Sequence, residues 1–113
     1  MATVYDIELD QGTDATIPFE LFDSNDRPLD LAGYSARMQV RTSAGSAEFA
    51  DELTTENGRL VIKGGTIEAH WPNAVTSKMR HGEMLYDIEI VSGGGEVTRI
   101  LEGAFILRRE ITR

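Results

Sequence analysis

Apolar and polar residues alternate along most of this chain, and this period of two limits its fold more than any other feature of the sequence. Successive side chains of a β-strand point to opposite faces, so strict alternation is typical of a strand with one face in a core and one in water. The pattern is clear at Tyr86, Ile88 and Ile90, which alternate with Asp87 and Glu89. This segment therefore predicts a half-buried strand.

The last quarter of the chain predicts two further strands. The glycine-rich run 92–95 supplies the positive-φ positions of a reversal. A second strand follows over 97–101, and Gly103 fits a bulge or a sharp bend. A third strand then covers 104–111. We expect a three-stranded meander here.

Shorter alternating segments precede this region, and they cover residues 4–9, 15–22, 34–41, 48–53, 60–62 and 67–71. In the first of them Tyr5, Ile7 and Leu9 are expected to face inward. Pro18 lacks an N–H group, so the second segment should be an edge strand or have an interrupted ladder. Asn57-Gly58 is a strong hairpin signal. Turns at this close spacing are typical of an all-β chain.

One segment, 73–80, predicts a short helical turn, with Asn73 as its cap, Val75 and Met79 on one face and Gly82 at its end. With eight or nine short strands around it, the chain predicts a single all-β domain over residues 1–113. The expected architecture is an antiparallel β-sandwich of immunoglobulin-like or jelly-roll type. Alternation does not say which strands pair, so both topologies stay open.

Composition excludes several classes of protein. At 113 residues the chain has room for one domain. It has no cysteine, so it has no disulfide or thiolate metal site. No apolar run approaches the roughly 18 residues of a membrane span, and the first residues lack the pattern of a signal peptide. We expect synthesis in the cytoplasm and no membrane partner.

The charge is acidic and uneven. A net charge of −8 argues against a nucleic-acid partner. Acidic residues gather in the first 30 positions, and basic residues gather around Glu110 near the end. Either the two end strands lie side by side and their opposite charges compensate each other, or the acidic edge of one copy contacts the basic tail of the next copy, head to tail. The candidate interface residues are Arg108, Arg109, Arg113, Asp6 and Glu8.

The motifs that usually carry chemistry are incomplete. The run 23–27 begins like a calcium loop but lacks the required glycine and distant glutamate. His70 and His81 have no paired ligand motif, and the glycines at 93–95 lack the Lys-Ser/Thr of a phosphate loop. The serines lack a histidine base and an elbow. We expect no catalytic, metal or cofactor site, and therefore no enzyme.

Two features suit recognition. Trp71 is either a core residue or an exposed anchor, and its shared parity with Ile67 and Ala69 favours the core. The final strand either adds itself to a neighbour's sheet edge or is an edge strand that its arginines protect.

The order of these elements resembles a family of small proteins found in tailed bacteriophages and prophages. The residues that carry the resemblance are PLDLAGYSARMQVR (28–41), TTENGRLVI (54–62), TIEAHW (66–71) and YDIEIVSGGGEVTRILEGAFILRREITR (86–113). More distantly, the chain is similar to the immunoglobulin-like attachment domain at the start of phage baseplate upper proteins, with Ala32 where that family prefers threonine. No fibre segment follows Arg113, which favours a stand-alone accessory subunit.

The resemblance implies a structural component of a virion, made in the host cytoplasm. Its partners would be other virion proteins, such as capsid, tail or baseplate subunits, and copies of itself. Two placements stay open, a tail, collar or baseplate module and a head decoration or cement protein. A different class, a carbohydrate- or other ligand-binding sandwich, also stays open and would need an exposed aromatic platform.

Overall fold

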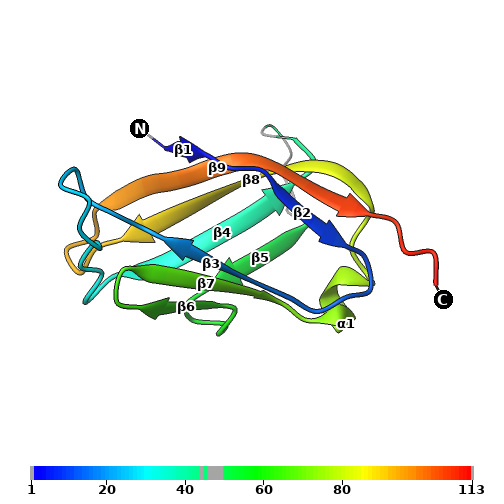
Figure 1. Cartoon of the computed structure of the whole chain (residues 1–113), viewed down its shortest axis with the longest axis horizontal. Coiled ribbons are helices and arrows are strands. Elements are labelled where there is room, and N and C mark those ends of the chain that lie inside the picture. Colours follow the sequence, from blue (N-terminus) through cyan, green and yellow to red (C-terminus); the bar gives the residue numbers. More distant parts are fainter. Residues whose placement is uncertain (1, 44, 46–49, 113) are drawn as a thin grey trace.

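The computed structural model describes residues 2–43, 45 and 50–112 and shows two β-sheets packed face to face (Figure 1). The strands in these residues are β1 (Thr3–Val4), β2 (Ile7–Asp10), β3 (Ala15–Glu20), β4 (Ser35–Arg41), β5 (Asp51–Thr54), β6 (Leu60–Lys63), β7 (Thr66–Trp71), β8 (Gly82–Val91) and β9 (Val97–Arg108). A single helical turn, α1 (Asn73–Thr76), joins β7 to β8. The expected all-β sandwich is confirmed.

The strand order separates the two expected topologies. The large sheet runs β1-β9-β8-β4-β5, with β2 also pairing with β9, and the small sheet runs β3-β7-β6. If β1 and β2 are taken together as the first strand, β3-β7-β6 and β9-β8-β4 are the B-E-D and G-F-C sets of an immunoglobulin-like sandwich. The first strand lies parallel to β9 on the large sheet instead of joining the small one.

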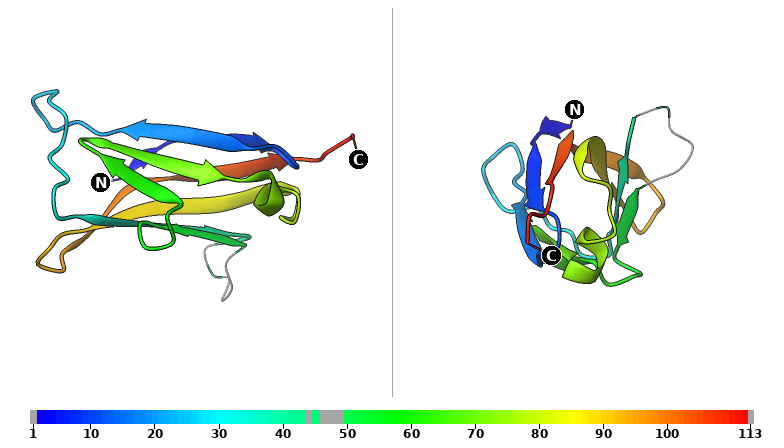
Figure 2. Two further views of the ribbon diagram at one scale, coloured as in Figure 1. Left: turned by 90° about the horizontal axis from the view of Figure 1, so that it is seen from below. Right: turned by 90° about the vertical axis from the view of Figure 1, so that its right-hand side faces the viewer.

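The core lies between the two layers that Figure 2 shows from below and from one end. Inward residues of both sheets fill it, and Trp71 packs against Phe105 with ring centroids 5.7 Å apart. Trp71 is 1% exposed, which confirms its expected place in the core. The alternating residues Ala36, Met38 and Val40 are likewise buried, so the period of two identified the inner face of β4 correctly.

Tyr5 departs from the expected alternation. Ile7 and Leu9 are buried as expected, but Tyr5 is 49% exposed because the chain bends between β1 and β2. The prediction for Pro18 is confirmed, since β3 is an edge strand of the small sheet. Leu21 donates its N–H to the Gly65 carbonyl beside β7. Main-chain direction alternates along a strand, so the proline nitrogen faces away from β7.

The expected three-stranded meander is wrong. β8 and β9 form one long hairpin, and β9 continues through Gly103 to Arg108. The irregularity in this hairpin lies between Ile88 and Glu89, opposite Ile100. A Cβ atom at position 103 would collide with the Tyr5 carbonyl. Glycine is therefore needed there for a close approach of two main chains and not for a bend.

The helical segment is shorter than expected. α1 ends at Thr76, and Gly82 begins β8 instead of ending a helix. Asn73 is not the cap of this helix. Instead, Asn73 donates both its main-chain N–H (2.6 Å) and its side-chain amide (3.0 Å) to the Asp14 carboxylate. The expected strand over 48–53 is β5 from Asp51 onward, while residues 48 and 49 lie outside the described part of the chain.

An ion pair joins the two sheets beside the β5–β6 connection. Arg59 donates to both carboxylate oxygens of Asp51 at 2.7 Å, and its Nε donates to the His70 carbonyl of the small sheet at 3.1 Å. The side chains are 18% and 9% exposed. Bidentate geometry in a partly dry site makes this pair stronger than a surface pair.

Candidate functional site

The predicted charge complementarity is partly satisfied inside one molecule. Because β2 lies beside β9, the Arg108 guanidinium is 3.8 Å from the Glu8 carboxylate and 3.6 Å from that of Asp10. All three side chains are more than half exposed, so these contacts are weak. The positions of Arg108 and Glu8 thus agree with the interpretation in which the charges of the two end strands compensate each other within one molecule.

Asp6 supports the bend between β1 and β2. Its carboxylate accepts the Ala104 N–H at 3.0 Å, while the Tyr5 N–H donates to the Glu102 carbonyl at 2.9 Å. The Tyr5 carbonyl turns inward and accepts a hydrogen bond from the buried Tyr86 hydroxyl. Burial raises the pKa of Tyr86 well above its ordinary value, and the neighbouring Tyr5 and Asp6 raise the pKa further. Three hydrogen bonds therefore fix the connection between β1 and β2.

The C-terminal segment, defined as residues 109–112, leaves β9 without joining a strand. Gln11 holds its start, because the Glu110 N–H donates to the Gln11 side-chain oxygen at 3.0 Å. Arg109 is exposed and Ile111 is 94% exposed. Arg113 lies outside the described residues. β9 has β8 on one side and, over residues 101–108, β1 and β2 on the other, so its C-terminal two-thirds has no open edge to add to a neighbour's sheet.

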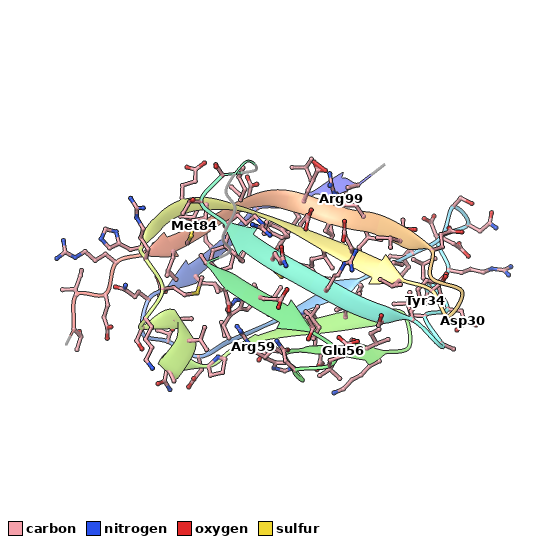
Figure 3. The ribbon with its side chains drawn as sticks, turned by 180° about the vertical axis from the view of Figure 1, so that it is seen from behind. Asp30, Tyr34, Glu56, Arg59, Met84 and Arg99 are labelled. Atoms are coloured by element: carbon pink, nitrogen blue, oxygen red, sulfur yellow. The ribbon has the colours of Figure 1, made fainter. Side chains whose placement is uncertain are left out.

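The outer face of the large sheet has an open hollow of about 620 Å³ between β4, β8 and β9. Figure 3 views the sandwich from this side and labels Arg99 on β9. Arg99 contacts Asp87 at 3.2 Å and Glu102 at 3.6 Å, and Arg37 contacts Glu89 at 2.8 Å. Burial, and then the Glu89 carboxylate, raises the pKa of Asp87 above its ordinary value, against the influence of Arg99. Leu85 and Val4 add exposed apolar surface to this hollow.

A second hollow, which we call the edge groove, lies where β3 of the small sheet faces β1 and β9 of the large sheet. Its apolar lining includes Tyr5, Phe19, Phe22, Leu29 and Ile100. The Tyr5 and Phe19 rings meet edge to face at 6.0 Å, and Phe22 is 53% exposed. Sequence reasoning missed the groove because it forms between two sheet edges, which no local pattern relates.

Three polar side chains on the small sheet have the order of a nucleophile, a base and an acid. Thr16 Oγ1 lies 3.1 Å from His70 Nδ1, and His70 Nε2 lies 3.6 Å from Glu68. They project from neighbouring strands on the outer face, and neither hollow described above includes them. Exposed cross-strand contacts of this kind are ordinary sheet pairs.

The apparent calcium-loop residues form a turn. The Asp23 carboxylate accepts the main-chain N–H groups of Asn25 (2.8 Å) and Arg27 (3.1 Å). This is the local bonding that favours aspartate in turns. Within the described ranges, no three His, Cys, Asp or Glu side chains gather closely enough to hold a metal ion.

Comparisons with known proteins were made by sequence and by structure. No protein-family model matches the chain, and no curated protein matches it. Among solved structures, extracellular domains 3–5 of Drosophila OTK match with a TM-score of 0.38 and 10% identity. That match covers 90% of this chain and 32% of the other, so this chain spans about a third of that structure. No helix in the described residues is long and apolar enough to cross a membrane.

Proposed function

We propose that this chain is a non-enzymatic structural component of a bacteriophage virion, a small β-sandwich that docks onto a larger assembly. The observation that carries the proposal is the pattern of strand and turn residues over 28–113, which resembles small tailed-phage proteins. In the structure these residues form β4 to β9 and the turns between them, which make up most of both sheets.

The outer face of the large sheet supports a docking role. Its charged side chains pair with one another across β4, β8 and β9, so a partner does not have to neutralise isolated charges there. Leu85 is 43% exposed and Val4 is 71% exposed at the same hollow. Apolar residues among satisfied polar groups are typical of protein interfaces.

The test is a quantitative mass-spectrometric copy number in purified particles, with heads and tails analysed separately. Hundreds of copies on heads would identify a decoration or cement protein. A few to a few dozen copies on tails would identify a tail, collar or baseplate module. Absence from both fractions would reject the virion role.

A ligand-binding sandwich is the second candidate, and one observation favours it. Tyr5 and Phe22 are about half exposed and line the edge groove together. Exposed aromatic rings are what a sugar-binding site needs. Glycan binding by the monomer, abolished by Tyr5→Ala and Phe22→Ala and unchanged by Leu85→Ala, would support this candidate over the first.

A further inference from the structure

The edge groove and the C-terminal segment lie at opposite ends of the molecule. β9 runs along the sandwich; its first residues, Thr98 to Leu101, line the groove, and its last residue, Arg108, leads into the segment. Figure 1 and the left view of Figure 2 show that the chain leaves β9 at the end of the molecule away from the β3–β4 loop and the β8–β9 hairpin.

The two ends are chemically complementary. The C-terminal segment presents the exposed Arg109 and, two positions on, the almost fully exposed Ile111. Most residues that line the groove are apolar, and Arg99, which also lines it, is paired with Asp87 and Glu102. The groove's end of the molecule carries exposed acidic residues, namely Glu20, Asp26, Asp30 and Glu96. One side therefore offers an apolar side chain beside a cation, and the other offers an apolar hollow beside carboxylates.

We propose that the C-terminal segment of one copy binds in the edge groove of the next copy, with Ile111 against Tyr5 and Phe22 and Arg109 toward Glu20. This inference deepens the proposed function, since it names a second copy of this chain as one partner. The contact is heterologous: each copy uses a different surface on each side. Contacts of this kind continue to add copies until a ring closes or a filament grows, whereas a two-fold symmetric dimer ends at two copies.

Head-to-tail contact was one of the two interpretations that the sequence left open, with Asp6 and Glu8 as its acidic side. The structure gives those residues other contacts, because Asp6 binds the Ala104 N–H and Glu8 lies beside Arg108 of the same molecule. The acidic side of the proposed contact is therefore the groove end, and its basic side begins at Arg109.

The experiment is sedimentation velocity on the full chain from about 10 µM to about 1 mM, a range that detects weak association. The weight-average mass should rise with concentration beyond two copies. Ile111→Glu should abolish this rise, and Leu85→Glu, which alters an exposed apolar residue on another face, should leave it unchanged. Thr98→Arg should also abolish it, because a long side chain at this exposed position would obstruct the groove without disturbing the core.

A mixture of variants provides the sharpest readout. The Ile111→Glu copy keeps a working groove, and the Thr98→Arg copy keeps a working C-terminal segment. An equal mixture should form complexes of two copies and no larger ones, although neither variant associates alone. In addition, Arg109→Glu should weaken association roughly fivefold, and Glu20→Arg in the same chain should restore it.

Three results would overturn the inference: a monomer at every concentration, a mass that stops at two copies, or a mixture that does not associate. Circular dichroism and thermal unfolding of each variant separate loss of contact from loss of fold. The outcome is independent of the virion role. A monomer found in particles keeps the proposed function and rejects the contact, whereas a head-to-tail assembly absent from particles does the reverse.

Discussion

Arg59 and Asp51 hold the two sheets together through a contact that few residues can replace. Two parallel N–H···O bonds of 2.7 Å need the planar guanidinium, and neither side chain is more than 18% exposed. Replacing Arg59 leaves a carboxylate in a site with little water.

We expect Arg59→Ala to lower the free energy of unfolding by about 3–5 kcal/mol, because it leaves the buried Asp51 carboxylate without its cation and with only the Glu52 N–H as a hydrogen-bond donor. Urea unfolding measures this change. The matched control is Arg37→Ala, which breaks a pair whose arginine is 50% exposed and should cost less than about 1 kcal/mol. Equal losses in the two variants would contradict the assigned role of the buried pair.

Tyr86→Phe removes the donor to the Tyr5 carbonyl and should cost about 1–3 kcal/mol at neutral pH, since that carbonyl is left without its partner. The raised pKa of Tyr86 adds a pH dependence. Below its ordinary value of 10.0 the hydroxyl is protonated in both the folded and the unfolded chain, so its contribution is fully present. Above that pH only the unfolded chain ionises readily, so the contribution is lost.

The measurement is the stability difference between the natural chain and Tyr86→Phe from about pH 8 to about pH 11. This difference should shrink with rising pH. Leu85→Ala serves as the control, because it removes an exposed side chain that carries no ionisable group, and its difference should stay constant. A constant difference for Tyr86→Phe would show that its hydroxyl is not protected from ionisation.

At the scale of the elements, the first strand depends on a missing side chain in β9. Gly103→Ala places a methyl group against the Tyr5 carbonyl, so the bend between β1 and β2 must shift. We expect a loss of about 1–3 kcal/mol and faster hydrogen exchange at the amides of Tyr5 and Ala104. Gly93→Ala, whose added Cβ would meet its nearest neighbour at an ordinary 3.7 Å, is the control. Unchanged exchange in Gly103→Ala would refute this account.

The sequence predicted most strands because alternation is a local signal that each strand carries by itself. The same signal could not give the sheet order, since pairing joins residues such as Asp6 and Ala104 that are 98 positions apart. Gly103 was misread for a physical reason: a bend and a close approach of main chains both need a residue without a Cβ atom.

The candidate site residues likewise include some that the sequence could predict and some that only the structure shows. Arg108 and Arg109 stood out by their charge, but only the structure separates Arg108, which lies near Glu8, from Arg109 in the exposed segment. The edge groove had no sequence signal, because it brings together Tyr5, between β1 and β2 of the large sheet, and Phe22, which follows β3 of the small sheet. Asp51 was missed because its segment mixes apolar and charged residues on one face.

At the scale of the whole molecule, β1 and β2 cover an edge of β9 that would otherwise be open. Removing residues 2–10 should leave residues 101–108 of β9 without a partner strand on that side. Exposed edges of this length pair with other chains, so the shortened protein should form dimers or aggregates in light scattering at concentrations where Ile111→Glu is monomeric. A shortened protein that stays monomeric and folded would show that β9 does not need β1 and β2 along this edge.

The parallel pairing of the first strand with the last also sets an order of events during synthesis. Residues 3–10 leave the ribosome long before their hydrogen-bonding partners, residues 101–108, are made. Until then the hydrophobic residues Ile7 and Leu9 have no sheet to join. Pairing across such long separations makes folding slow, so the nascent chain must keep its first strand from wrong partners while the rest is translated.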